Sequence, residues 1–211
     1  MPHDDFAVEP IQGLPETPPA GETILWQGKP KTYALARDAL NMNWIAGYFV
    51  LLAIWRAGVS SIEMPFAQAA ATGIPFLILG AVTCGVLLLM AWVMARTTVY
   101  TITTARVALR VGAALTVTLN LPYTRIGSAD LITRKDGTGT LVFDTLGETR
   151  LSYLVLWPHV RPWRMKKTQP AMRSIPDGAK VAQIFADAAE TRITQPEIAI
   201  KPATGGAVAA E

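Results

Sequence analysis

The longest uninterrupted run of hydrophobic positions covers residues 74–95, which are 22 consecutive residues without a charged side chain. At 1.5 Å per residue such a helix measures about 33 Å, which matches the ~30 Å hydrocarbon core of a bilayer. Trp92 lies near one end and Arg96 follows at once, as is typical of a membrane interface. The pattern therefore predicts a membrane-spanning helix over residues 74–95.

A second, weaker hydrophobic segment covers residues 43–62. Arg56 interrupts it, although an arginine near a helix end can extend its guanidinium to the lipid headgroups. Trp44 and Trp55 would mark the two interfaces, but only about 16 Å of helix separates them. We expect a second span here and keep a half-inserted or interfacial helix as the alternative.

The basic residues predict the orientation of these two spans. Lys29, Lys31 and Arg37 precede the first span, and residues 57–73 between the spans contain no lysine or arginine. Fifteen basic and nine acidic residues follow the second span, which gives that part a net charge of +6. Because basic flanks stay on the cytoplasmic side, we expect a multi-pass protein of the bacterial inner membrane with both termini in the cytoplasm.

The N-terminal segment, residues 1–36, is rich in proline and acidic residues. It lacks the basic start and apolar core of a signal peptide, and its composition is typical of disordered chain. We expect a flexible cytoplasmic arm here. The predicted hairpin then occupies residues 37–96, a cytoplasmic domain residues 97–193, and a loose tail residues 194–211.

Beyond Arg96 the pattern changes to short segments in which apolar and polar positions alternate, as in half-buried β-strands. Leu115, Val117 and Leu119 show this alternation most clearly. Glycines mark turns at position 112 and within residues 135–139. The predicted strands cover residues 99–102, 107–111, 115–119, 125–133, 141–143 and 151–157.

An amphipathic helix is predicted over residues 175–192. Its apolar face consists of Val181, Ile184, Phe185 and Ala188. Ser174 and Asp177, three residues apart, indicate an N-terminal cap. Six or seven antiparallel strands and one final helix predict a pleckstrin-homology-like (PH-like) barrel. The expected fold class is an α+β membrane protein, with a two-helix transmembrane hairpin and a PH-like antiparallel β-barrel capped by a C-terminal α-helix.

Two short motifs resemble bacterial PH domains. Residues 100–107, YTITTARV, followed by Gly112, are similar to the opening hairpin of these domains. Residues 21–28, GETILWQG, match the Gly-Glu-x-x-x-Trp-x-Gly segment that often precedes the first span in membrane-attached members. The resemblance implies a PH-like domain attached to a membrane.

A more specific resemblance extends from His3 to about Ala189. In their order along the chain, the segments HDDFAVEPIQGLPETPP, ILWQGKP, ALNMNWIAGYFVLLAIWR and LWPHVRPWRMKKTQPAMRSIPD are similar to the PuhB family of purple-bacterial assembly proteins. The resemblance implies a role in assembling the photosynthetic reaction centre and its light-harvesting complex, in the intracytoplasmic membrane and without catalysis. That family is often described with three spans, but the third candidate here, residues 141–157, contains charged residues and is predicted to form strands.

The strongest candidate site is a basic and aromatic segment, residues 157–173, which contains no acidic residue. Arginine and tryptophan are favoured at protein interfaces, and basic clusters bind anionic headgroups. We expect contact with a partner subunit or with lipid headgroups, and keep a solvated loop packed on the barrel as the alternative. The candidate residues are Trp157, His159, Arg161, Trp163, Arg164, Lys166, Lys167 and Arg173.

The sequence offers no set of residues for catalysis, and we expect neither an enzyme nor a cofactor. His3 and His159 are the two histidines, and the single cysteine, Cys84, lies inside an apolar run, so a zinc site is not expected. Cys84 is interpreted as a small packing residue. His159 is interpreted as a hydrogen-bonded structural residue, and ligation of a bacteriochlorophyll magnesium is its alternative role.

Two functions from different classes remain. The first is an assembly protein that docks on reaction-centre subunits, with light-harvesting polypeptides as further partners. The second is a membrane-anchored PH-like module that binds lipid or protein and has no link to photosynthesis. Nucleic acid is not expected as a partner, because the domain is tethered beside a membrane, and homodimerisation is left open.

Overall fold

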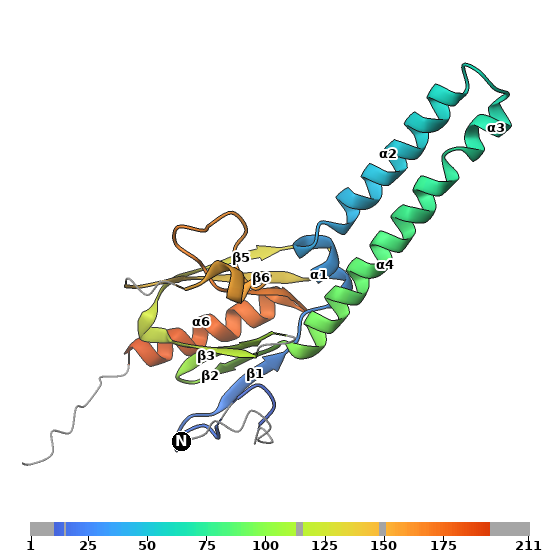
Figure 1. Cartoon of the computed structure of the whole chain (residues 1–211). Helices are drawn as coiled ribbons and strands as arrows, with labels where there is room; N and C mark the ends of the chain where they lie inside the picture. Colours follow the sequence, from blue (N-terminus) through green and yellow to red (C-terminus); the bar gives the residue numbers. More distant parts are fainter. Residues whose placement is uncertain (1–10, 15, 113–115, 148–150, 195–211) are drawn as a thin grey trace, which may run out of the picture.

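A computed structural model describes residues 11–14, 16–112, 116–147 and 151–194. Figure 1 shows a helical hairpin that projects from an α+β domain made of two antiparallel sheets and one long helix. The chain forms its first strand in this domain, leaves through the hairpin and returns to build the other strands. His3, Leu115 and the predicted tail beyond Thr194 lie outside the described residues.

The helical hairpin consists of α2 (Met42–Ser60), the short α3 (Phe66–Ala71) at its tip, and α4 (Ile74–Thr97). Within the described chain, Met42–Ser60 and Phe66–Thr97 are each long and apolar enough to cross a membrane. Only 11% of either apolar window is buried. The hairpin therefore presents a hydrophobic surface along most of its length, where the sequence predicts its two spans.

Small residues let α2 and α4 approach closely. A Cβ atom at Gly80 would lie 2.7 Å from the Cβ atom of Phe49, so glycine is needed where this ring crosses α4. A Cβ atom at Gly73 would lie 2.8 Å from the backbone oxygen of Ala53. Close packing through small residues is the usual way in which helices associate when both are hydrophobic on all sides.

The β-strands form two separate sheets, and every pairing is antiparallel. The first sheet has the order β1 (Ile24–Gly28), β2 (Val99–Thr103), β3 (Arg106–Val111) and β4 (Val117–Pro122). The second has the order β5 (Ile126–Thr133), β6 (Gly139–Thr145) and β7 (Ala171–Ile175). The hairpins β2–β3 and β5–β6 lie where the sequence predicts strands at 99–102 and 107–111 and a glycine turn at 135–139.

The long helix α6 (Gly178–Thr194) lies between the two sheets (Figure 1). Phe185 joins both sides of the core, because its ring centroid lies 5.2 Å from that of Phe143 in β6 and 5.6 Å from that of Tyr123. Val181 and Ala188 are buried on the same face. The predicted apolar face of this helix is therefore confirmed.

The predicted closed barrel is wrong. Within the described residues the sheets share no strand pairing, because a 3-10 turn, η1 (Tyr123–Arg125), redirects the chain between β4 and β5. The helix α6 fills the space between the sheets and contributes to the same core as both of them. The domain has the strands and C-terminal helix expected of a PH-like fold in an open arrangement.

Two predictions near the end of the domain are also wrong. The predicted strand at 151–157 contains a helical turn instead, α5 (Tyr153–Leu156), and the last strand is β7. Ser174 belongs to β7 and Asp177 has a φ of 49°, so α6 begins at Gly178, without the predicted cap at Ser174. Short apolar runs do not distinguish a strand from a helical turn, and pairing with β6 decides the outcome.

The predicted flexible arm is wrong for its second half. There the chain forms β1, which pairs with β2, and the helix α1 (Thr32–Ala39). Glu22 explains the ordering, because its carboxylate accepts two hydrogen bonds from Arg106, at 2.9 and 3.1 Å, and one from Thr103 at 2.7 Å. Trp26 packs against the core of the domain. The motif at residues 21–28 therefore attaches the chain to the first sheet.

The contact between β6 and α6 provides a test of this packing. A Cβ atom at Gly139 would lie 2.6 Å from the Cα atom of Gly178, which the backbone cannot accommodate without moving. We expect Gly139→Ala to lower the free energy of unfolding by about 1–3 kcal/mol. Thermal unfolding of the full chain in detergent measures this. Gly47→Ala is the control, because nothing lies within 4 Å of its added atom; equal losses in both variants would contradict the packing.

Candidate functional site

The structure separates the eight candidate residues into three groups. His159 and Arg173 are buried at the base of the hairpin. Arg161 and Lys167 form ion pairs with the second sheet. The others are exposed to solvent, and they are Trp157, Trp163, Arg164 and Lys166. The predicted site is therefore a buried junction and a separate exposed surface.

His159 lies beside the end of α4, where the hairpin enters the domain. Its Nδ1 atom is 2.6 Å from the Tyr100 hydroxyl, and its Nε2 atom is 3.1 Å from Oγ1 of Thr98. The Tyr100 oxygen accepts the backbone N–H of Arg173 at 3.2 Å, which leaves its own hydrogen to donate to Nδ1. We therefore assign the ring hydrogen to Nε2, where it donates to Thr98. Because protein atoms occupy both nitrogens, His159 is placed as a structural residue.

Burial determines the charge of this histidine. Desolvation, and then the nearby positive charge of Arg173, lower the pKa of His159 to about 3. The imidazole is therefore neutral at physiological pH. A neutral ring can donate at one nitrogen and accept at the other, as this network requires.

Arg173 connects three segments of the chain. Its side chain is carried by β7, and its guanidinium donates to the backbone oxygen of Asp38 at 2.6 Å and to that of Pro158 at 3.2 Å. The residue is only 7% exposed, and burial lowers its pKa, although an arginine remains charged in proteins. Arg173 is therefore a buried cation that fixes α1 and the segment before His159 to the second sheet, and its predicted surface role is wrong.

Further ion pairs hold the β5–β6 turn against α1. The Asp38 carboxylate lies 2.9 Å from Arg37 and 3.0 Å from Arg134, and Arg37 lies 2.8 Å from Asp136. Hydrogen bonds from Thr138 and Arg37 hold the pKa of the Asp136 carboxyl well below its usual range. The ion pairs thus join the turn to the base of the hairpin.

Basic side chains gather around this base. Arg96 lies over the ring of Trp92 at the end of α4, 4.7 Å from its centroid. Arg37 at the end of α1 and Arg134 in the β5–β6 turn both pair with the Asp38 carboxylate near this base. The basic residues that these contacts place at the base of the hairpin are Arg37, Arg96 and Arg134.

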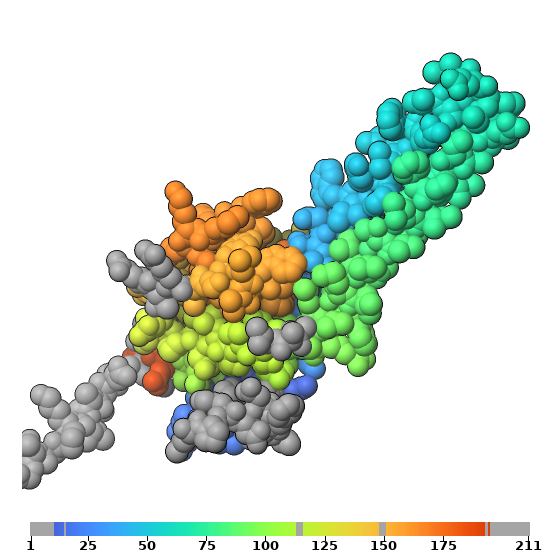
Figure 2. Space-filling view, in the orientation of Figure 1, coloured from blue at the N-terminus to red at the C-terminus, as the bar shows by residue number. Residues whose placement is uncertain are grey.

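The exposed surface is a loop that we call the amphipathic loop, residues 153–167. Figure 2 shows this orange segment projecting from the domain. It contains no acidic residue. Its exposed apolar side chains are Leu154, Val155, Trp157, Trp163 and Met165, and its exposed basic side chains are Arg164, Lys166 and Lys167. Exposed hydrophobic clusters of this kind are typical of interaction sites.

Two ion pairs attach the amphipathic loop to the second sheet, one in its middle and one at its C-terminal end. Arg161 donates to Asp130 of β5 at 2.9 Å, and Lys167 lies 2.6 Å from Asp144 of β6. The Lys167 hydrogen bond lowers the pKa of the Asp144 carboxyl. These contacts leave Arg164 and Lys166 as exposed cations between them.

Sequence reasoning missed the apolar half of this loop. The sequence pattern predicts a strand at Leu154 and Val155, and the predicted site consists of basic and aromatic residues, so it omits Met165. Leu154 is 85% exposed and Met165 is 65% exposed. The absence of any acidic residue from 153 to 173 was the signal that marked the region.

The other residues considered for chemistry have packing roles. Cys84 contacts a small cluster between α1 and the hairpin, which consists of Ala36, Leu40, Met42 and Ala91. Within the part of the chain that the structure describes, no three side chains of histidine, cysteine, aspartate or glutamate gather closely enough to hold a metal ion.

Comparison with known proteins finds one matching family and a relative of similar length. The sequence profile of the family described as "Bacterial PH domain" matches residues 44–189, which include both the hairpin and the two sheets. A protein of Rhodobacter capsulatus, described as an uncharacterized 23.7 kDa protein in the puhA 5′ region, is 44% identical over 212 residues. The alignment covers 99% of each chain. No solved structure matches.

Replacing Arg173 tests the buried junction. We expect Arg173→Met to lower the free energy of unfolding by about 3 kcal/mol, because the backbone oxygens of Asp38 and Pro158 lose charged donors. Arg173→Lys should recover little, since an ammonium cannot reproduce the two directions of the guanidinium. Thermal unfolding in detergent measures both. The control is Arg192→Met on the exposed face of α6; an equally small effect at both sites would contradict the junction.

The buried His159 predicts a specific pH dependence. Its pKa is about 3 in the folded chain and 6.5 unperturbed, so below pH 6.5 the unfolded state binds the additional proton and stability falls as pH falls. Between pH 7 and pH 5 this residue should contribute a loss of about 2 kcal/mol. His159→Gln should be less stable at pH 7 but should lack this dependence. Identical pH slopes for both proteins, measured by thermal unfolding, would rule out a neutral buried histidine.

Proposed function

Since this chain belongs to the family of bacterial PH domains, we propose that it is a non-catalytic assembly protein of the photosynthetic reaction centre and its light-harvesting complex. It docks on their subunits at the cytoplasmic surface of the membrane. The observation that carries the proposal is the buried junction of Arg173 and His159, which fixes the PH-like domain to the apolar hairpin. A domain held in one orientation loses less rotational entropy when it binds membrane-embedded subunits than a freely tethered domain would lose.

The link to photosynthesis rests on sequence. The Rhodobacter capsulatus relative is described by its place in the puhA 5′ region, and the PuhB family that the chain resembles shares the puh designation. The two similarities extend over nearly the whole chain. They support an assembly role over a PH-like lipid- or protein-binding module unrelated to photosynthesis, which is the alternative.

The proposal includes insertion of the hairpin in the inner, intracytoplasmic membrane. Insertion is supported by the exposed apolar surface of α2 and α4, whose apolar windows are only 11% buried. Both ends of the hairpin meet the domain, and basic residues lie at these ends. The far tip, residues 57–73, contains no lysine or arginine. Because basic flanks stay in the cytoplasm, the domain and both termini are assigned to that side.

Co-purification from photosynthetic membranes tests the assembly role. The full chain carries an affinity tag, the membranes are solubilised in mild detergent, and the eluate is read by mass spectrometry and pigment absorption. We expect reaction-centre subunits with their pigment, together with light-harvesting polypeptides. The Arg173→Met variant should retain fewer subunits at equal membrane content, because its domain is no longer fixed.

The controls separate the two functions. An untagged strain gives the background, and Arg192→Met, on the exposed face of α6, gives the effect of removing a charge outside the junction. Recovery of neither subunits nor pigment with the wild-type chain would reject the assembly role and leave the unrelated PH-like module as the better account. Equal recovery with wild type and Arg173→Met would retain assembly but reject the fixed orientation as its basis.

A further inference from the structure

The amphipathic loop combines two properties that a solvated loop does not need. Trp163 is 87% exposed, and its φ of 63° lies in the left-handed region, which is unfavourable for a residue with a side chain. Leu154 and Met165 are also largely exposed. The fold therefore holds large apolar side chains away from its own core.

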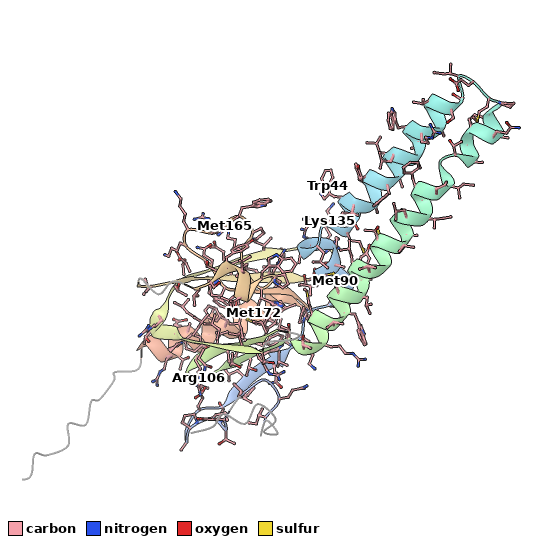
Figure 3. All side chains as sticks on the ribbon, in the orientation of Figure 1. Trp44, Met90, Arg106, Lys135, Met165 and Met172 are labelled. Atoms are coloured by element: carbon pink, nitrogen blue, oxygen red, sulfur yellow. The ribbon has the colours of Figure 1, made fainter. Side chains whose placement is uncertain are left out.

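The position of this loop relates it to the hairpin. His159 lies within the loop and bonds Thr98, the residue directly after α4, so the loop is attached where the hairpin ends. Figure 3 shows Met165 at the upper left edge of the domain, and Lys135 and Trp44 at the upper right, where the hairpin begins. The loop therefore extends sideways from the hairpin base.

We propose that the amphipathic loop inserts into the anionic membrane surface beside the hairpin, as a second and interfacial membrane contact of this protein. Trp163 and Met165 enter the boundary between headgroups and acyl chains, and Arg164 and Lys166 bind the anionic headgroups. Tryptophan and basic side chains with apolar neighbours are the composition found at that depth. The proposal depends on membrane insertion of the hairpin, which is part of the proposed function.

A lipid surface fits these observations better than a protein partner. The loop carries cations and no acidic residue, as an anionic leaflet requires, and the leaflet is continuous with the surface that the hairpin already occupies. Arg161 and Lys167 are engaged by Asp130 and Asp144, so the exposed cations outside these two ion pairs are Arg164 and Lys166, at the tip of the loop between them. Insertion of the tip requires exposed cations there, and the ion pairs beside them hold the loop on the domain.

Spin labels measure the depth of the loop directly. The full chain, with Cys84→Ala to remove its single cysteine, is placed in lipid nanodiscs that contain anionic phosphatidylglycerol and no other protein. Nitroxides are attached in separate samples through Met165→Cys in the loop, Val82→Cys on the exposed surface of α4, and Ala186→Cys on the exposed surface of α6. Collision with oxygen reports lipid, and collision with a water-soluble nickel complex reports solvent.

The label at Met165 should favour oxygen over nickel severalfold relative to Ala186. Adding Arg164→Glu and Lys166→Glu, or using zwitterionic lipid alone, should return it to solvent, whereas Arg192→Glu should have no effect. A label at Met165 as open to nickel as Ala186, with Val82 in lipid, overturns the loop proposal while the anchor stands. Solvent exposure at Val82 would instead reject hairpin insertion and the loop proposal with it.

Discussion

The architecture depends on one buried cation at the point where the hairpin meets the domain. The Arg173 guanidinium donates to backbone oxygens at the end of α1 and before His159, and the backbone N–H of the same residue reaches Tyr100. A buried charge is costly unless its hydrogen bonds are made, so these partners must come together in the folded chain. These hydrogen bonds therefore fix the angle between the hairpin and the domain, which a flexible connection would leave free.

Because the angle between the hairpin and the domain is fixed, surfaces on the two parts keep a constant position relative to each other. The amphipathic loop is held at the end of α4 by the hydrogen bond between His159 and Thr98, and Arg37 and Arg134 are held at α1 by Asp38. The ion pairs of Arg161 and Lys167 then present the loop tip. Under the proposed assembly role, the loop would contact the lipid surface and the other faces of the PH-like domain would be left for protein subunits.

The sequence predicted those features that depend on local pattern. The charge-free run at 74–95 located α4, the β-rich run at 99–102 located β2, and the glycine turn at 135–139 located the hairpin β5–β6. Long-range contacts produced the errors. The composition of residues 1–36 is typical of disordered chain, but in the part that the structure describes Glu22 pairs with Arg106, 84 positions away. In the same way, pairing with β6 selects the strand β7, and it turns Arg173 from an expected surface residue into a buried one.

The Arg173 junction should hold the PH-like domain rigidly on its hairpin. The distance between a spin label at Gln68 near the hairpin tip and one at Ala186 on α6 tests it, in a Cys84→Ala chain reconstituted in nanodiscs. Both sites are exposed and lie on opposite sides of the junction. We expect a single narrow distance distribution, and we expect it to broaden in the Arg173→Met variant because the junction is lost. A broad distribution in the chain that retains Arg173 would contradict it.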